Sequence, residues 1–463
     1  MQTRRRFLAR TTAALALAGV RPAMATTMAM QEITAREALA QLAPPAFPQT
    51  AVWSYDDGIP GPMIRLSQGD RLRRRLVNDL PEPTSIHWHG IRIDNAMDGV
   101  SGLTQQAVEP GQSFDYDFAL PDAGTYWYHA HNRSWVQVAR GLHGPLIVEE
   151  AEPLDIDLED VLVLDDWLLD PATAQINADF YQPMTLSHAG RLGNLVSTNG
   201  RYDYSLSVRR NDRIRLRLIN ASNARILPLQ LVGLRGWTVA LDGMPLATPE
   251  VLDGVLVLAP AQRADLIVDV IAEDGETAHL ARLGQDGNAA SQAAFPVTGA
   301  RSTTPRGAPP PLPPNPRTDL LDLGATRSER LVMSGGAMGR MTSAILGGER
   351  VSAPELAGQG RYWSLNDLAE MPQTPLADLA FGETVRMTIV NDTLFPHAMH
   401  LHGMHFRELM PEDRQGPLRD TLLIGANETR EIAFAADNPG DWLFHCHMLS
   451  HAAAGMTTWV RVS

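Results

Sequence analysis

Short runs of hydrophobic residues alternate with polar clusters along most of the chain. The runs are rich in Val, Leu and Ile, and clusters of Gly, Pro, Asn and Asp separate them. This pattern is typical of β-sandwiches and β-barrels. Helical periodicity is scarce, although the spacing of Thr34 and Glu37 matches a capping box and predicts one short helix that runs to Leu42. The sequence therefore predicts an all-β fold.

Three ten-residue segments repeat this strand pattern and align without gaps. Each segment ends in Asn, and counting nine and eleven residues beyond that Asn gives His-x-His in the first and third copies. The middle copy has Leu229 and Leu231 at the same places. Internal repeats of this kind indicate a duplicated domain. The chain is thus predicted to contain three related β-domains, with metal-binding residues only in the first and third. The segments are 69–78, 211–220 and 382–391.

The repeats and the turn-rich stretches between them set the expected domain boundaries. A Pro-rich tract at 305–317 is expected to be an extended linker between the second and third domains. The first and third domains are expected to come together around a shared site, with the middle domain as a spacer. The first domain is expected at 44–151, the second at 152–304 and the third at 318–463.

Four His-x-His pairs occur in the sequence, whereas its histidine content predicts about 0.4 such pairs by chance. Residues i and i+2 of a strand point to the same face, so each pair presents two imidazoles side by side. Eight imidazoles exceed the four ligands that one zinc ion takes, and without metal they would leave many buried polar groups unsatisfied. The pattern therefore predicts a cluster of several metal ions. The pairs are His87 and His89, His129 and His131, His400 and His402, and His445 and His447.

The single cysteine of the chain, Cys446, lies between the two histidines of the fourth pair, so its side chain is expected on the opposite face of that strand. His451 and Met456 follow at intervals of five residues, and His397 precedes the third pair. Two His, one Cys and a weak axial Met make the trigonal blue-copper site of electron-transfer proteins. An electron that enters at this copper would leave through the Cys446 sulfur toward the flanking histidines.

The segments that carry these residues resemble the four copper motifs of the multicopper oxidases, the laccase-like family. The resemblance covers the chain after its first 25 residues, and the middle domain lacks a copper motif in both. It implies three cupredoxin-like Greek-key domains, each a β-sandwich or barrel. It also implies four coppers per chain: one type 1, one type 2 and two type 3. The segments are HWHG at 87–90, HAH at 129–131, HAMHLHG at 397–403 and HCHMLSHAAAGM at 445–456.

The resemblance also implies a ligand for each copper. Members of the family oxidise a reducing substrate one electron at a time and reduce O₂ to water. Electrons are expected to enter at His451, the ligand that the family exposes to solvent, and Cys446 is expected to pass them to the cluster. The type 1 ligands would be His397, Cys446, His451 and Met456; type 2 would take His87 and His400; and the type 3 pair would take His89, His129, His131, His402, His445 and His447.

Oxygen reduction needs protons, so carboxylates near the cluster are of interest. Asp98 stands where relatives place such a carboxylate, and we expect it to relay protons. Many bacterial relatives have a Glu directly after the last type 1 His, where this chain has Ala452. Three methionines form a faint counterpart of the Cu(I)-collecting insertions of metal-oxidising relatives, with ordinary packing as the alternative: Met333, Met338 and Met341. Three histidines outside every motif are expected to be structural or surface residues: His143, His188 and His279.

The first 25 residues have the features of a twin-arginine signal peptide. Arginines at 4–6 precede an apolar stretch at 13–20 that is too short to span a bilayer, and 23–25 is a small-x-small cleavage site. The sequence therefore predicts export by the twin-arginine machinery, a periplasmic location, and no stable insertion into the membrane.

The amino-acid composition excludes several other functions. All 39 basic residues are Arg, which excludes a Schiff-base lysine and a P-loop. A net charge of -14 repels phosphate backbones, so no nucleic-acid partner is expected. The leading hypothesis is a copper-dependent oxidase that uses O₂ and a small-molecule or metal-ion electron donor. Phenols, aromatic amines, Cu(I) and Mn(II) stay open as donors. The alternatives are a copper-binding or sequestration protein, or a cell-envelope structural protein, of the same fold without turnover.

Overall fold

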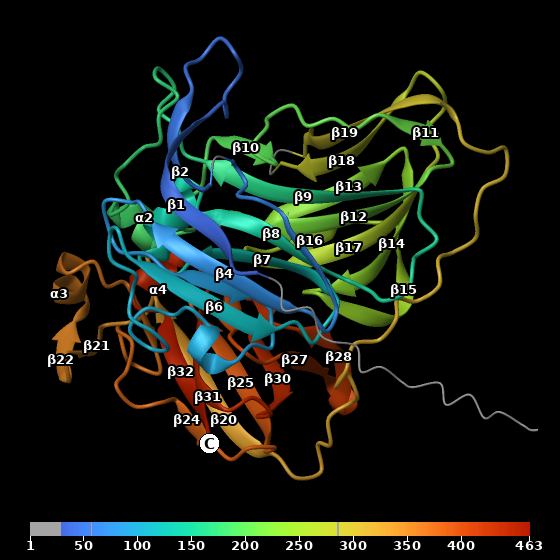
Figure 1. The fold of residues 1–463 in the computed structure, drawn as a ribbon. Helices are drawn as coiled ribbons and strands as arrows, with labels where there is room; N and C mark the ends of the chain where they lie inside the picture. Colours follow the sequence, from blue (N-terminus) through green and yellow to red (C-terminus); the bar gives the residue numbers. More distant parts are fainter. Residues whose placement is uncertain (1–28, 57, 285–286) are drawn as a thin grey trace, which may run out of the picture.

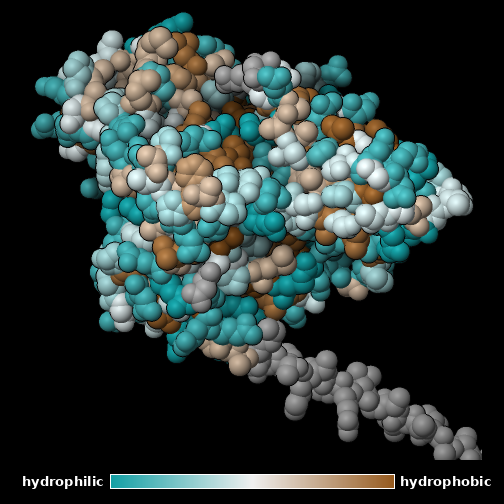
Figure 2. All heavy atoms as spheres, turned by 90° about the horizontal axis from the view of Figure 1, so that it is seen from above, coloured by the Kyte–Doolittle hydropathy of each residue, from teal (hydrophilic) through white to brown (hydrophobic). Residues whose placement is uncertain are grey.

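The structure, a computed structural model, describes residues 29–56, 58–284 and 287–463, so the predicted signal peptide at 1–25 lies outside it. Strands dominate these ranges and helices are short, which confirms the all-β class. Figure 1 shows three lobes in chain order, the first in blue and cyan, the second in green and yellow, and the third in orange and red. On the face in Figure 2, apolar residues lie in separate patches among hydrophilic ones. No helix in the described ranges is long and apolar enough to cross a membrane.

The first lobe packs two four-stranded sheets against each other, in the orders β2-β1-β4-β6 and β3-β8-β7-β5. The second sheet carries the first two histidine pairs on β5 and β7. The elements are β1 (Gln31–Ala40), β2 (Thr50–Tyr55), β3 (Ile64–Ser67), β4 (Arg71–Asn78), β5 (Ile86–His89), η1 (Asn95–Met97), β6 (Ser113–Ala119), β7 (Gly124–Ala130), α1 (Ser134–Gln137), η2 (Val138–Arg140) and β8 (His143–Glu149).

The middle lobe has a six-stranded sheet, β10-β9-β12-β17-β14-β15, and a five-stranded sheet, β11-β19-β18-β13-β16. Its elements are β9 (Leu158–Trp167), α2 (Pro183–Ser187), β10 (Leu195–Thr198), β11 (Val208–Arg210), β12 (Arg213–Asn220), β13 (Leu227–Val232), β14 (Leu234–Leu241), β15 (Met244–Leu252), β16 (Leu256–Leu258), β17 (Arg263–Val270), β18 (Thr277–Leu283) and β19 (Ala289–Ala300).

The third lobe has a six-stranded sheet, β23-β20-β25-β30-β27-β28, a five-stranded sheet, β24-β32-β31-β26-β29, and the hairpin β21-β22. Its elements are β20 (Arg327–Gly335), β21 (Ser343–Leu346), β22 (Glu349–Ser352), α3 (Ala353–Gly358), β23 (Trp363–Leu365), β24 (Ala377–Leu379), β25 (Thr384–Asp392), β26 (His397–Leu401), β27 (Phe406–Met410), η3 (Pro411–Asp413), β28 (Arg414–Arg419), β29 (Thr421–Ile424), β30 (Thr429–Ala435), β31 (Gly440–Cys446), α4 (Leu449–Ala453) and β32 (Thr457–Val462).

The three aligned sequence segments form β4, β12 and β25, which occupy matching places in the three lobes. In the middle lobe Leu229 is fully buried in the core, where the other two lobes carry histidines. The apolar cores of the first and third lobes merge into one continuous cluster, whereas the middle lobe has its own. This contact between the first and third lobes places their histidine-bearing sheets together.

The short helix predicted from Thr34 to Leu42 is wrong, because residues 34–40 lie in strand β1 and residues 41–42 belong to no helix. β1 pairs with β2 and β4 in the first sheet, which therefore begins ahead of the expected domain start at 44. Ile33 and Ala35 are buried, two residues apart, as on one face of a strand. Burial of this face and the backbone hydrogen bonds to β2 and β4 outweigh the local capping pattern. Helix propensity is only a weak preference, which tertiary contacts override.

The Pro-rich tract at 305–317 contains no helix or strand, as expected of an extended segment, but it is held against the protein. Leu312 packs in a small cluster with Trp237. The buried Asn315 side chain accepts a hydrogen bond from the backbone N–H of Ala123 at 2.8 Å and donates to the Ala123 carbonyl at 2.7 Å. The tract is therefore an extended linker that packs against the first and middle lobes.

Candidate metal centre

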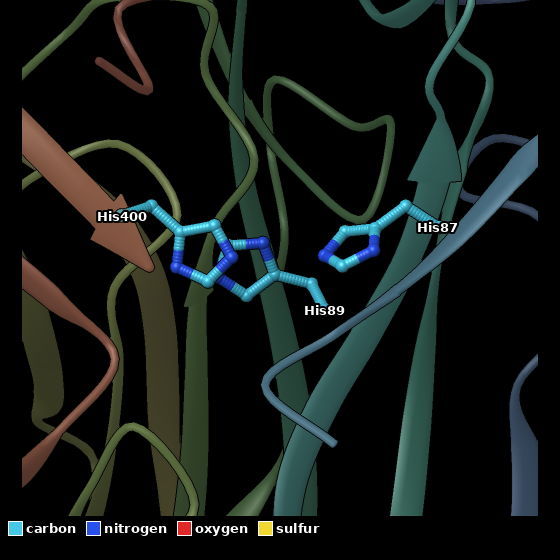
Figure 3. Close-up of side chains that lie close together, drawn as sticks. All are labelled: His87, His89 and His400. Carbon is cyan, nitrogen blue, oxygen red and sulfur yellow. The ribbon is translucent and has the colours of Figure 1, made fainter. Parts of the chain in front are cut away.

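The eight paired histidines converge where the first and third lobes meet. In the first lobe β5 and β7 pair so that His87 lies opposite His129, and in the third lobe β26 and β31 pair so that His400 lies opposite His445. Figure 3 shows His87 and His89 from the first lobe facing His400 from the third. The fold therefore brings one face of each strand pair to a shared buried site.

The histidine nitrogens form three groups, and within each group the candidate ligand atoms lie within 4.8 Å of one another. In two groups the ring nitrogens of two histidines face each other, His129 Nε2 with His447 Nε2 at 3.4 Å and His402 Nε2 with His445 Nε2 at 3.2 Å. Nδ1 of His402 and of His445 each donates to an oxygen, so both of their Nε2 atoms are acceptors, and a cation between them would satisfy both. The groups are His87, His89 and His400; His89, His129 and His447; and His131, His402 and His445.

Backbone carbonyls fix the ring orientations. His87 Nδ1 donates to the Asp98 carbonyl and His400 Nδ1 to the Asp420 carbonyl, both at 2.9 Å. His445 Nδ1 donates to the Cys446 carbonyl at 3.0 Å. The opposite nitrogen, Nε2, is then left as a lone-pair donor that points into the site, which is how a protein prepares a metal-binding imidazole.

Several of these inward nitrogens are buried without any hydrogen-bond partner within the described residues: His87 Nε2, His89 Nδ1, His131 Nε2 and His400 Nε2. Buried polar atoms are rarely left unsatisfied. Burial and neighbouring histidines lower the pKa of six of the cluster imidazoles well below the ordinary value, which keeps them neutral and ready to bind metal. These are His89, His129, His131, His402, His445 and His447. The donor set fits a multinuclear metal cluster.

Asp98 lies fully buried against this cluster, immediately after η1. Its Oδ2 accepts a hydrogen bond from His402 Nδ1 at 3.0 Å, and its backbone carbonyl holds His87. One residue thus orients a histidine from each lobe. The sequence expectation that Asp98 sits beside the cluster agrees with this geometry, while its proposed proton relay is a further step.

Asp420, which precedes β29, is a second buried carboxylate that the sequence did not single out. Its Oδ1 lies 3.3 Å from His89 Nε2, and its two oxygens accept from Arg263 of β17 at 2.9 and 2.6 Å. Burial opposes ionisation of Asp420, but Arg263 and His89 outweigh it and hold the pKa of this carboxyl well below its usual range. The middle lobe therefore contributes a buried cation that supports the cluster through Asp420. No motif or spacing in the sequence marks this pair.

A separate group of candidate metal ligands, apart from the histidine cluster, consists of His397, Cys446 and His451, all fully buried. The Nδ1 atoms of the two histidines lie 3.1 Å apart, and Cys446 Sγ lies 3.7 Å from His397 Nδ1 and 3.9 Å from His451 Nδ1. Met456 is also fully buried, and its carbonyl accepts from the Cys446 N–H at 3.1 Å. The expected type 1 residues are therefore neighbours.

The protonation of this group also fits a metal. His397 Nε2 donates to Thr393 Oγ1 at 2.9 Å, which leaves Nδ1 free to bind. Burial raises the pKa of the Cys446 thiol to about 12 and lowers that of His451 to about 4. A thiolate in this apolar pocket needs a bound cation, because a coordinated thiol is deprotonated outright. A soft thiolate with imidazoles selects copper.

The expectation that His451 is open to solvent is wrong. It is 0% exposed, and its Nε2 donates to the His188 carbonyl of the middle lobe at 2.7 Å. The methionines singled out from the sequence do not share one environment, since Met333 is buried in the core and Met338 is 79% exposed. Ala452, which stands where many bacterial relatives have Glu, lies in α4 and offers no carboxylate. Among the described residues, Asp98 and Asp420 are carboxylates that do contact the cluster histidines.

Fold and site together define a β-protein with two separate sets of candidate copper ligands, one of histidines and one of Cys446 with His397 and His451. Models of the multicopper oxidase family match residues 39–153 and 349–463. Multicopper oxidase MmcO of Mycobacterium tuberculosis is 30% identical over 445 residues, covering 89% of this chain and 83% of that protein. The chain belongs to the multicopper oxidase family.

Solved structures agree with this assignment. A multi-copper oxidase from Pseudomonas thermotolerans superposes with a TM-score of 0.81 and 33% identity, covering 94% of this chain and 99% of that one. Lac15 from a marine microbial metagenome superposes with a TM-score of 0.76 and 40% identity, covering 94% of this chain and 100% of that one. The three lobes are cupredoxin-like β-domains, and the protein is a copper-dependent oxidoreductase that couples oxidation of a reducing substrate to reduction of O₂.

Proposed function

We propose that each chain binds one type 1, one type 2 and two type 3 coppers. The observation that carries this arrangement is that the candidate ligand atoms form three groups of histidines only and a separate Cys-His-His group, beside a fifth group in which Asp98 joins His87 and His402. His87 and His400 would hold the type 2 copper, with the two groups that contain His129 and His131 holding the type 3 pair. His397, Cys446, His451 and Met456 would hold type 1.

Copper bound there supplies one-electron redox chemistry. The chain's own residues connect the two centres, because Cys446 lies on the strand β31 between His445 and His447. The Cys446 side chain faces the type 1 group and its two neighbours face the cluster. A few covalent bonds therefore link the electron-entry site to the site where O₂ is reduced.

We further propose that the chain is exported by the twin-arginine machinery and works in the periplasm. Support comes from the arginines at 4–6, the short apolar stretch and the cleavage site at 23–25. This route carries folded proteins, often with their cofactors, which suits an oxidase with buried coppers.

The first experiment is oxygen uptake by copper-loaded residues 26–463 with 2,6-dimethoxyphenol, Cu(I) or Mn(II) as donor. We expect uptake with the phenol. Uptake with Cu(I) or Mn(II) alone would assign a metal oxidase instead. Protein that is blue, holds copper and consumes no oxygen with any donor would contradict turnover and favour copper sequestration.

Asp98 is proposed to relay protons to the cluster, because it is buried and bonded to His402. Asp98→Asn keeps the size but cannot take up a proton at neutral pH, so we expect kcat to fall about 100-fold. Copper content and the blue absorption should stay unchanged. The measurement is the rate at which the fully reduced enzyme is reoxidised by O₂.

The matched control is Asp94→Asn, because Asp94 is exposed and lies four residues earlier on the same loop. This variant should reoxidise at the wild-type rate. An Asp98→Asn enzyme with normal copper content and an unchanged rate would remove the relay from the proposal.

A further inference from the structure

Two loops that carry residues of the cluster meet at the turn between β30 and β31. The first loop runs from the end of β5 to Asp98 in the first lobe, and the second follows His402 in the third lobe. Asp98 Oδ2 accepts a hydrogen bond from His402 Nδ1 at 3.0 Å, so this bond crosses from one lobe to the other. It forms only where the two loops are held at a fixed distance from each other.

The side chain of Asn438, which lies in this turn, ties the two loops together. Its amide Nδ2 donates to the Ile93 carbonyl of the first loop and to the Gly403 carbonyl of the second, both at 2.9 Å. Gly403 directly follows His402, and Ile93 lies five residues before Asp98 on the same loop. The two protons of one NH₂ group therefore hold both of the segments that present the cross-lobe pair.

The turn that holds Asn438 is itself packed in place. The indole Nε1 of the fully buried Trp442 donates to the Asn438 carbonyl at 2.8 Å. The Trp442 ring also packs against Gly403, where an added Cβ would clash with the ring. Gly403 has a φ of 69°, in the left-handed region that favours glycine. The Asn438 amide is thus presented to both loops by a packed frame.

A second hydrogen bond ties the first loop to the start of β31. Asn95 Nδ2 donates to the Asp441 carbonyl at 2.7 Å. This close approach requires glycine at position 440, where an added Cβ would clash with the Asn95 side chain. Asn95 opens η1, which ends directly before Asp98. The third lobe therefore holds the loop that carries Asp98 at two points, Ile93 and Asn95.

We propose that Asn438 is a positioning residue for the histidine cluster, an inference that rests on the proposed function. Its amide keeps the Asp98 carboxylate against His402 and the Asp98 carbonyl against His87. It thereby sets the orientation of one imidazole from each lobe. Asn438 makes its own hydrogen bonds to two backbone carbonyls and one indole, so it acts on the copper ligands through Asp98.

The test variant is Asn438→Asp, which keeps the shape of the side chain but places an acceptor oxygen where the NH₂ group donated. In the copper-free chain, the backbone amides of residues 91–98 should exchange with deuterium about tenfold faster than in wild type, because the loop has lost a tie to the third lobe. In the loaded enzyme, the affinity for the cluster coppers, measured by chelator titration, should fall about tenfold.

The type 1 group reports whether the effect is confined to the cluster. Its blue absorption and reduction potential should be the same in Asn438→Asp and wild type, because the hydrogen bonds of Asn438 in the described part of the chain go to none of the proposed type 1 ligands.

A double-mutant cycle separates positioning from a general loss of stability. Alone, Asn438→Asp should slow reoxidation of the fully reduced enzyme by O₂ about tenfold, which is less than the effect expected of Asp98→Asn because the carboxylate is still present. In a chain that already carries Asp98→Asn, adding Asn438→Asp should slow reoxidation less than about twofold, since no carboxylate is left to position.

Asn199→Asp is the matched control. Asn199 is also half-buried, and its amide donates to the backbone carbonyl of Val161 at 2.9 Å. It lies in the middle lobe, which supplies none of the proposed copper ligands, so this variant should change none of the readouts. Asn95→Ala removes the second tie alone and should raise deuterium exchange of the same loop about threefold. It keeps the proposal testable if Asn438→Asp does not fold.

Unchanged exchange of residues 91–98 in Asn438→Asp would overturn the proposal, as would equal losses of copper at the type 1 group and at the cluster. Fully additive effects of Asn438→Asp and Asp98→Asn on reoxidation would also overturn it. Wild-type protein that binds no copper at the cluster, or binds it and consumes no oxygen, would instead remove the proposed function. Because the exchange measurement uses the copper-free chain, the two failures are distinguishable.

Discussion

Replacing Cys446 by Ser is expected to give a folded chain that keeps copper at the histidine cluster but oxidises no donor. The thiolate is the soft ligand of the type 1 group, and a hydroxyl does not replace it for copper. Serine is nearly the same size, so the fully buried position stays filled. Metal analysis should find one copper per chain fewer than in wild type, the blue absorption should vanish, and oxygen uptake should drop to background.

Met456→Leu is the matched control for this experiment, because Met456 belongs to the same buried group but supplies only a weak axial ligand. This variant should stay blue and active, with an altered reduction potential. Donor oxidation by Cys446→Ser with the cluster coppers in place would contradict the single path through the sulfur.

Asp420→Asn is expected to destabilise the copper-free chain by about 3 kcal/mol, because it removes the closest anionic partner of the buried Arg263 and leaves only the more distant Asp242, at 3.8 Å. The same change weakens the hold on His89, so copper should be lost more readily to a chelator, by about 10–100-fold in affinity. Urea titration of the copper-free chain measures the first effect, and chelator titration of the loaded enzyme measures the second.

The Asp117→Asn variant controls for loss of an ordinary surface pair, since Asp117 and its partner Arg71 are 36% and 53% exposed. Its cost should stay below about 1 kcal/mol. Adding Arg263→Met to Asp420→Asn should restore much of the lost stability, because the buried charge that has lost its closest partner is removed. A double variant as unstable as Asp420→Asn alone would show that the cost has another origin.

The sequence predicted the features that follow from local periodicity. Alternation gave the all-β class, and the two-residue period of a strand placed the two imidazoles of each His-x-His pair on one face. The three aligned segments identified matching strands in the three lobes, including the leucines that replace histidine in the middle one. These inferences succeeded because they depend on spacing alone.

The features that sequence reasoning missed depend on contacts between distant segments. The partners Arg263 and Asp420 come from different lobes, and neither lies in a copper motif. The group that covers His451 is the backbone carbonyl of His188, and every residue has a carbonyl, so no residue type signals it. The strand at Gln31–Ala40 was mistaken for a helix for a related reason, since its pairing partners lie elsewhere in the chain.

The sharing of each histidine group between the first and third lobes has a consequence for the order of events during synthesis. Every group of the cluster combines ligands from 87–131 with ligands from 400–447. A growing chain holds only one or two of the three histidines of each group until β26 and the segment from β31 to His447 are made. Complete copper loading of the cluster must therefore follow synthesis of β31 and His447, and a chain truncated before β31 would have no complete copper cluster.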